Sequence, residues 1–216
     1  MKKYKAALFD LDGVLVDTAK YHYLAWKELA ARLGFEFTEK DNERLKGVSR
    51  MASLEILLEV GGMQDRFTQE EKDAMAAEKN ARYVEYISKM DASEILDGAL
   101  DCLKELKKRG VKIALGSASK NSPIILNNVG LTPYFDEIVD GNSVSKAKPD
   151  PEVFTQGAQR LGVPYEDCAV FEDSLAGLQA AKAVNMLAVG IGTRENLPAA
   201  DVIYPSLKEF ESEKFS

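Results

Sequence analysis

The chain has 216 residues, of which 45% are hydrophobic, so it can bury the core of one compact domain with an insertion. Its formal net charge of −7, without a basic stripe, argues against a nucleic-acid partner. No apolar run approaches the ~20 residues of a membrane span, and none forms a signal peptide. Cys102 and Cys168 lack metal-ligand spacing and are typical of buried thiols in a reducing compartment. We therefore expect a cytoplasmic monomer without nucleic-acid or membrane partners.

Two carboxylates follow the first predicted strand. Residues 4–9 are an apolar run typical of a short buried strand, and Asp10-Leu11-Asp12-Gly13 comes next. Once the chain turns, Asp10 and Asp12 can face one crevice, where adjacent carboxylates repel each other unless a cation or a shared proton is present. Taken alone, this tetrapeptide is more typical of a plain turn. Three later segments favour the first interpretation.

The next segment, from about residue 14 to residue 91, has helical patterns and no convincing strand. A capping box, Thr68-x-x-Glu71, marks the start of its last helix. We interpret the segment as a helical cap inserted after the first strand, with hinges near residues 14–16 and 90–95. Three apolar stripes at helical spacing support this: Trp26, Leu29, Ala30 and Leu33; Met51, Leu54 and Leu58; and Ala77, Ala81, Val84 and Ile87.

Beyond residue 96, helical and strand patterns alternate, which is typical of a parallel sheet covered by helices on both faces. Strands are predicted at 111–115, 137–139, 169–171, 187–189 and 202–203, and helices at 99–106, 122–129, 153–161 and 175–183. The polar tail, residues 211–216, is expected to fray. The predicted fold class is α/β, with a core of residues 1–14 and 92–216 and a cap of residues 15–91.

Small polar residues follow the strand at 111–115. Ligands of an open parallel sheet lie at the carboxyl ends of its strands. Residues 116–121, Gly-Ser-Ala-Ser-Lys-Asn, precede a helix, and their hydroxyl groups and free backbone N–H groups suit a phosphate. Taken alone, Ser119 or Asn121 is more typical of an ordinary helix N-cap.

Two charged segments follow later strands. Pro149 restricts Lys148 to an extended conformation in a strand-to-helix connection, although a solvated loop lysine is an equal alternative for this residue alone. Glu172 and Asp173 come directly after the strand at 169–171 and offer oxygen ligands suited to Mg²⁺. In isolation, this pair is more typical of a helix cap.

Together, the four segments supply the parts of phosphoryl transfer through an aspartyl phosphate: a nucleophile, Mg²⁺, a phosphate cradle and a cation. In this order, over nearly the whole chain, they resemble the haloacid dehalogenase-like phosphotransferase superfamily, whose members have a Rossmann-like core and a cap. The resemblance implies that Asp10 is the nucleophile and Asp12 the general acid/base. It further implies that Asp10, the Asp12 main-chain carbonyl and Asp173 hold Mg²⁺, with Glu172 beside them. Ser117 would bind the transferring phosphate, and Lys148 would balance the charge of that phosphate.

The predicted cap carries a closer resemblance. Residues 45–50, Leu-Lys-Gly-Val-Ser-Arg, with His22, Trp26, Lys79 and the loop at 117–121, are similar to the β-phosphoglucomutase family. That family interconverts β-D-glucose 1-phosphate and glucose 6-phosphate through an aspartyl-phosphate enzyme and a glucose 1,6-bisphosphate. The resemblance implies that Arg50 holds the non-transferring phosphate, a task suited to its bidentate guanidinium. The other implied substrate-binding residues are Trp26, Gly47, Val48, Ser49, Lys79, Ala118, Ser119, Lys120 and Asn121.

Several residues keep alternative roles. Gly47 is also typical of a helix end, and Arg50 of a solvated charge. His22 is the only histidine in the sequence. A lone histidine is more often structural, but this one follows the Asp10 loop closely enough to orient Asp12, and the resemblance includes it in the hinge. We therefore count His22 as a candidate catalytic residue.

The core motifs do not separate a mutase from its competitors. Either a sugar hydroxyl or water can attack a phosphoaspartate, so a Mg²⁺-dependent sugar-phosphate phosphatase is the main alternative. Arg50 and Lys120 favour the mutase because they provide a second anion site. A phospho-aspartate signalling module is a third hypothesis, against which the long helical insertion argues.

Overall fold

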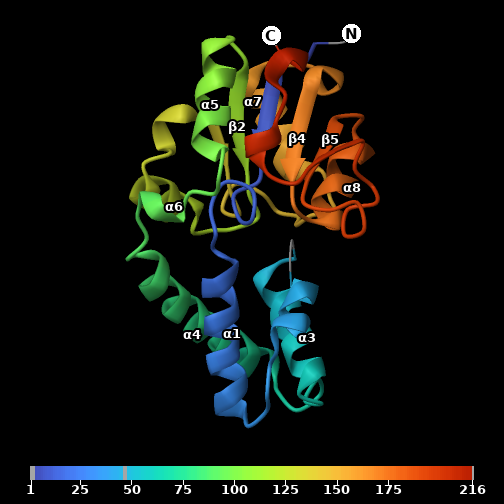
Figure 1. Cartoon of the computed structure of the whole chain (residues 1–216). Coiled ribbons are helices and arrows are strands. Elements are labelled where there is room, and N and C mark those ends of the chain that lie inside the picture. The colour runs from blue at the N-terminus through green and yellow to red at the C-terminus, as the bar shows by residue number, and fades with distance from the viewer. Residues whose placement is uncertain (1–2, 46–47, 216) are drawn as a thin grey trace.

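The computed structural model describes residues 3–45 and 48–215 of the chain. Two regions lie end to end in Figure 1: a sheet flanked by helices, and a group of helices below it. We call the helical region from α1 to α4 the cap, and the sheet region the core. In the part of the chain described, no helix is long and apolar enough to cross a membrane.

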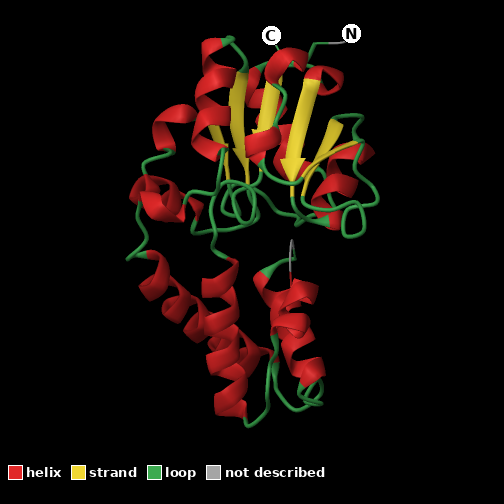
Figure 2. Cartoon of the chain, in the orientation of Figure 1, coloured by secondary structure: helices red, strands yellow, loops and turns green. Residues whose placement is uncertain are grey.

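The core is built on one sheet in which every strand is parallel to its neighbours. The order β3-β2-β1-β4-β5-β6 reverses between β1 and β4, which is the doubly wound, Rossmann-like arrangement. The carboxyl ends of the strands point toward the cap (Figure 2). The strands are β1 (Ala6–Phe9), β2 (Lys112–Gly116), β3 (Glu137–Val139), β4 (Cys168–Glu172), β5 (Leu187–Ile191) and β6 (Val202–Tyr204).

Alternate residues of each strand pack on opposite faces of the sheet. Phe9 lies in an apolar cluster with α5 (Ala99–Lys108) and α6 (Ser122–Val129). Its neighbour Leu8 lies in a second cluster with α7 (Glu152–Leu161) and α8 (Leu175–Ala183). Both faces are therefore covered, which explains why the strands read as continuous apolar runs. The predicted α/β class is confirmed.

The cap packs around an apolar cluster of its own. Trp26, Leu54 and Leu58 are buried there, in agreement with the first two predicted stripes. At the start of the last helix, the Thr68 hydroxyl accepts from the Glu71 backbone and the Glu71 carboxylate accepts from the Thr68 backbone, which confirms the capping box. The helices are α1 (Ala19–Leu33), α2 (Glu39–Asn42), α3 (Arg50–Val60) and α4 (Gln69–Ile87).

The predicted apolar stripe of α4 is wrong in its first half, although Ile87 is buried and Val84 packs against the core cluster as predicted. Ala77 and Ala81 are exposed, because the helix is turned so that a lysine and a tyrosine face inward. Periodicity of apolar residues selected the alanines, whereas the long stem of a lysine can be buried when its head finds partners. The buried residues of α4 are Ala76, Lys79, Tyr83 and Ile87.

The expectation that the C-terminal tail frays is also wrong for its described part. Phe215 is buried, and its ring lies 5.6 Å from that of Tyr4 and 5.3 Å from that of Phe210. Tyr4 and Phe215 also form a parallel bridge, so the two ends of the chain are tied together. One buried aromatic side chain outweighs the polarity of its neighbours.

The two connections between core and cap lie side by side. Val16 forms an antiparallel bridge with Ile95, and the Asp17 N–H donates to the Glu94 carbonyl at 3.0 Å. The Glu94 carboxylate also accepts hydrogen bonds from Lys20 and Tyr21 at the start of α1. The cap is thus joined to the core by one paired crossing.

Candidate active site

The candidate residues meet where the strand order reverses. Asp10 follows β1 and Glu172 ends β4, so both lie at the switch point of the sheet, where ligands of such folds bind. A cavity of about 500 Å³ lies between this edge and the cap. Residues of the core and of the cap both line it, so a ligand there contacts both regions.

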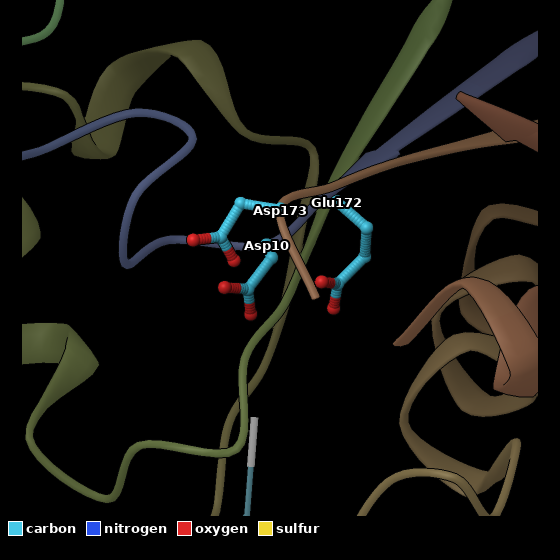
Figure 3. A group of neighbouring side chains, drawn as sticks. All are labelled: Asp10, Glu172 and Asp173. Carbon is cyan, nitrogen blue, oxygen red and sulfur yellow. The ribbon is translucent and has the colours of Figure 1, made fainter. Parts of the chain in front are cut away.

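Three carboxylates converge at the floor of this cavity. One carboxylate oxygen from each of Asp10, Glu172 and Asp173 lies within 4.8 Å of the others, and Figure 3 shows the three side chains turned toward one another. Gly13, with φ of 78°, allows close approach, because a Cβ there would collide with the Asp173 carboxylate. An all-oxygen donor set of this kind fits a divalent cation. The Asp12 carboxylate is not part of this cluster, and the Asp12 main-chain carbonyl stays a predicted ligand.

Lys148 is a buried partner of two of these carboxylates. Its Nζ lies 2.6 Å from Asp10 Oδ1 and 2.5 Å from Glu172 Oε1. Burial opposes the charged form of Lys148, but the two carboxylates outweigh burial and raise its pKa. The alternative of a solvated loop lysine is therefore wrong. Burial, only partly offset by Lys148, raises the pKa of Asp10 well above its usual range.

Glu172 does not cap the helix that follows it. The N-cap of α8 is Ser174, whose hydroxyl accepts from the Gly177 N–H. Glu172 Oε2 accepts from the Ser174 N–H and hydroxyl, at 3.1 and 2.8 Å. Both oxygens of Glu172 are thus held in place, one by Lys148 and one by Ser174. A Cβ at Gly177 would collide with this carboxylate, so the start of α8 packs directly on it.

Asp12 is linked to the cap through a row of polar side chains. Thr18, at the start of α1, donates a short hydrogen bond to Asp12 Oδ1. His22 Nε2 lies 4.0 Å from the same oxygen, and His22 Nδ1 lies 2.9 Å from Lys79 Nζ. Burial raises the pKa of Asp12 against the effect of the Thr18 bond. His22 therefore lies beside Asp12 but beyond hydrogen-bonding distance, and its role in orienting Asp12 stays a prediction.

Burial lowers the pKa of both His22 and Lys79. Burial, followed by the nearby charges of Lys79 and Arg50, holds the pKa of His22 well below its usual range. Burial and the charge of Arg50 lower the pKa of Lys79 to about 7. Trp26 supports Lys79, because its ring centroid is 4.5 Å from Nζ. Because only part of the Lys79 population is protonated near neutral pH, an anion that arrives beside it can raise its pKa and draw a proton onto the amine.

The loop at 117–121 folds around its own hydroxyl groups. Ser117 is fully buried, and its Oγ accepts from the Ser119 N–H at 3.1 Å. Ser119 Oγ in turn accepts from the Asn121 N–H at 3.2 Å. Asn121 is the N-cap of α6 but makes no side-chain cap bond, so the ordinary N-cap alternative does not describe it. Ala118, Ser119, Lys120 and Asn121 all line the cavity.

The cap supplies the opposite wall. Val48, Ser49 and Arg50 line the cavity, and the Ser49 hydroxyl also caps α3 by accepting from the Ala52 N–H. Arg50, the first residue of α3, has no ion pair within the described residues. Gly47 lies outside the part of the chain that the structure describes.

Three polar residues at the site escaped sequence reasoning: Thr18, Asn80 and Tyr83. Thr18 binds Asp12, and Asn80 bonds to Asn121 across the cavity. Tyr83 is fully buried, and its ring stacks on His22 with centroids 4.0 Å apart. A neutral polar residue within an amphipathic helix gives no periodic signal, although the position of Thr18 just before a helix is an N-cap signal.

The chain is similar in sequence and in structure to proteins of known family. The model of the haloacid dehalogenase-like hydrolase family matches residues 4–185. β-Phosphoglucomutase of Bacillus subtilis (strain 168) is 43% identical, over 92% of this chain and 88% of that protein. A phosphorylated carbohydrates phosphatase of Thermotoga maritima is 32% identical, over 84% and 82%. The crystal structure of β-phosphoglucomutase from Clostridium difficile has a TM-score of 0.92 at 42% identity, over 97% of this chain and 94% of that one.

These similarities confirm the predicted superfamily and fold, and they identify the protein as an enzyme. They also imply a divalent metal, which the cluster of Asp10, Glu172 and Asp173 fits. The match of the family model extends from β1 through α8 and so includes the carboxylates, the 117–121 loop and Lys148. The chain belongs to the haloacid dehalogenase-like hydrolase family.

Proposed function

We propose that this enzyme is a β-phosphoglucomutase, which interconverts β-D-glucose 1-phosphate and glucose 6-phosphate. The observation that carries the proposal is a cavity lined by cations from both the core and the cap. Lys148 lies beside Asp10, while Arg50 and Lys120 line the same cavity without an acidic partner among the described residues. In a chain of net charge −7, unpaired cations in one cavity are suited to an anion that the substrate brings. A hydrolase of monophosphates needs only the cation beside Asp10.

The chemistry would use Asp10 and Asp12 in two mirrored steps. In the first, the 6-hydroxyl of β-glucose 1-phosphate attacks phospho-Asp10, so that the O6–P bond forms, the Asp10 O–P bond breaks, and Asp12 accepts the hydroxyl proton. The bisphosphate then turns around. In the second, Asp10 attacks the phosphorus at C1, the P–O1 bond breaks, and Asp12 returns its proton to O1. Phospho-Asp10 is regenerated and glucose 6-phosphate leaves.

We propose Mg²⁺ as the divalent metal, held by the carboxylates of Asp10 and Asp173 and the Asp12 main-chain carbonyl, with Glu172 beside them. Oxygen ligands alone suit this ion. When bound, it would neutralise charge on the transferring phosphoryl group. Lys148 would balance the same charge, and Ser117 would bind a phosphoryl oxygen.

The raised pKa of Asp12 supports its role in proton transfer. A carboxyl whose pKa is raised by burial carries its proton at neutral pH more of the time than an exposed one, so it is available as a general acid more often. His22, with its low pKa, stays neutral and can orient Asp12 without adding charge. Trp26 and Lys79, with Val48 and Ser49, would form the sugar-facing wall.

The arrangement of the two regions supports a hinge motion between them. We propose that residues 15–91 form the cap domain, which closes over residues 1–14 and 92–216 and excludes water during transfer. We also propose that the enzyme acts in the cytoplasm as a monomer on small sugar phosphates. Both of its cysteines are buried free thiols, as is usual in a reducing compartment.

One assay separates the mutase from the phosphatase. Purified protein is mixed with Mg²⁺, β-glucose 1-phosphate and a trace of β-glucose 1,6-bisphosphate, and glucose 6-phosphate and free phosphate are followed together. We expect fast formation of glucose 6-phosphate with little free phosphate. Phosphate release without isomerisation would make the enzyme a sugar-phosphate phosphatase. The Asp10→Asn variant should give neither product.

A further inference from the structure

One hydrogen bond crosses the cavity from the cap to the phosphate loop. The side-chain amide of Asn121, just before α6, donates to Oδ1 of Asn80 on α4 at 2.9 Å. Both side chains line the cavity and are partly buried. We propose, resting on the proposed mutase function, that Asn80 is a positioning residue: it latches the cap onto the phosphate loop and so shields phospho-Asp10 from water.

Asn121 has enough hydrogen-bonding groups to serve the cap and a phosphate together. A side-chain amide carries two N–H donors, and the bond to Asn80 uses one of them. The second donor is left for a phosphate oxygen. The bond to Asn80 and a bound phosphate therefore do not compete for Asn121. Each of the two contacts holds the Asn121 side chain in an orientation that also allows the other contact.

The helix that carries Asn80 also carries the cap's contact with the acid/base. Lys79, the preceding residue, has its Nζ 2.9 Å from His22, which in turn lies 4.0 Å from Asp12. α4 is continuous over 19 residues, so its side chains move together. Anchoring Asn80 to the phosphate loop therefore also holds Lys79 and His22 in place over Asp12.

A second asparagine bond between the same two helices offers a matched control. The Asn128 amide donates to the main-chain carbonyl of Ile87 at 3.0 Å, at the end of α4 and away from the cavity lining. Asn128 and Asn121 are seven residues apart, as are Ile87 and Asn80, so the contact repeats after about two helical turns. The Asn128→Ala variant removes a similar bond without touching the site.

The lifetime of phospho-Asp10 in the absence of sugar tests the latch. The enzyme is phosphorylated with acetyl phosphate and Mg²⁺, freed of the donor, and followed as the label is lost to water. We expect Asn80→Ala to shorten the lifetime about five-fold, which is the population change that one ordinary hydrogen bond gives. Asn128→Ala should stay within about two-fold of the wild type. No sugar is present, so a direct contact of Asn80 with the substrate cannot produce this effect.

A conservative variant separates positioning from structure. Asn80→Asp keeps the acceptor oxygen, so the lifetime should return to that of the wild type, while the added charge raises KM for the sugar phosphate. In turnover, Asn80→Ala should raise the ratio of free phosphate to glucose 6-phosphate by the same factor of about five.

Two results would overturn the latch: an unchanged lifetime in Asn80→Ala, or an equal loss in Asn128→Ala. Failure of the mutase assignment is recognised separately, because the wild type would then release phosphate without forming glucose 6-phosphate. The lifetime measurement tests the latch in either case, since it needs only phosphorylation of Asp10.

Discussion

The core and the cap hold their charged groups in opposite ways. In the core, Lys148 lies between Asp10 and Glu172 and is only 5% exposed, so each charge has a fixed partner. In the cap, Arg50 has no ion pair among the described residues, and the pKa of Lys79 is lowered to about 7. The buried lysine of the core thus has its two partners before a substrate arrives. Arg50 in the cap has none among the described residues and is suited to a charge that the substrate brings.

This difference divides the work of the enzyme. Preorganised charges stabilise a transition state because they need no reorganisation at the moment of reaction. Unpaired charges in a closing region recognise the ligand, because their desolvation is compensated only when a phosphate is present. We therefore expect the loss of Lys148 to affect chemistry and stability together, and the loss of Arg50 to affect recognition alone.

The largest effect is expected from removing the fixed cation of the core. Lys148→Ala leaves two buried carboxylates without a counter-charge, so we expect a loss of about 3–5 kcal/mol in the free energy of unfolding of metal-free protein. Urea unfolding at pH 7 measures this loss. Without Lys148, burial raises the pKa of Asp10 still further above its value in the unfolded state, so the folded variant binds more protons and the loss should shrink as the pH falls.

The exposed ion pair between Lys5 and Asp167, 2.8 Å apart, provides the control for this experiment. Lys5→Ala should leave the unfolding midpoint unchanged, because exposed pairs contribute little. A Lys148→Ala protein as stable as the wild type would show that the core is not held by this pairing, and the contrast between the two regions would disappear.

An intermediate effect is expected from the cap's unpaired arginine. If Arg50 holds the non-transferring phosphate, as we propose, Arg50→Ala removes charge-assisted hydrogen bonds to it, so KM for β-glucose 1-phosphate should rise by roughly 10- to 100-fold. Phosphorylation of Asp10 by acetyl phosphate, which carries no second phosphate, should stay within about two-fold. Arg44→Ala, on the cap but paired with Glu59 outside the cavity, serves as the control. If both reactions fell equally, Arg50 would belong to the chemistry and not to recognition.

The smallest effect concerns the proton on Lys79. With a pKa of about 7, Lys79 is mostly neutral at pH 8, and an arriving phosphate dianion raises the pKa and draws a proton onto the amine. Binding should therefore take up a fraction of a proton at pH 8 and much less at pH 6, where Lys79 is already charged. Calorimetry of sugar-phosphate binding in buffers of different ionisation enthalpy measures this uptake. Uptake that persists in the Lys79→Met variant would assign the proton to another group.

Much of the core could be predicted from the sequence because its signals are local. An apolar run followed at once by Asp10, or by Glu172, places a carboxylate at a strand end whatever the order of the strands. The predicted helices at 122–129 and 175–183 agree with α6 and α8, since Gly130 marks the end of α6 and Ser174 caps the start of α8. The order of the strands itself has no local signal, because it depends on pairing between segments as distant as β1 and β4.

The sequence predicts that the cap is helical, but it does not predict which face of each cap helix is buried. Its helices and the Thr68 capping box were visible in the sequence, yet the buried face of α4 was misjudged because it contains Lys79 and Tyr83, which no apolar pattern includes. Asn80 was missed for a related reason. Its role arises only where α4 meets Asn121, 41 residues further along the chain. Contacts of this kind follow from tertiary packing and not from spacing.

The paired crossing at Val16 and Ile95 has a consequence for how such enzymes diversify. The chain leaves and re-enters the core at one point, so the segment between Val16 and Ile95 is an insertion whose two ends lie side by side. A different insertion with equally close ends would leave the path of every core strand unchanged. Transplanting one contiguous segment would therefore exchange the cap and its contacts with Asp12, while Asp10, Lys148 and Glu172 would keep their places in the core.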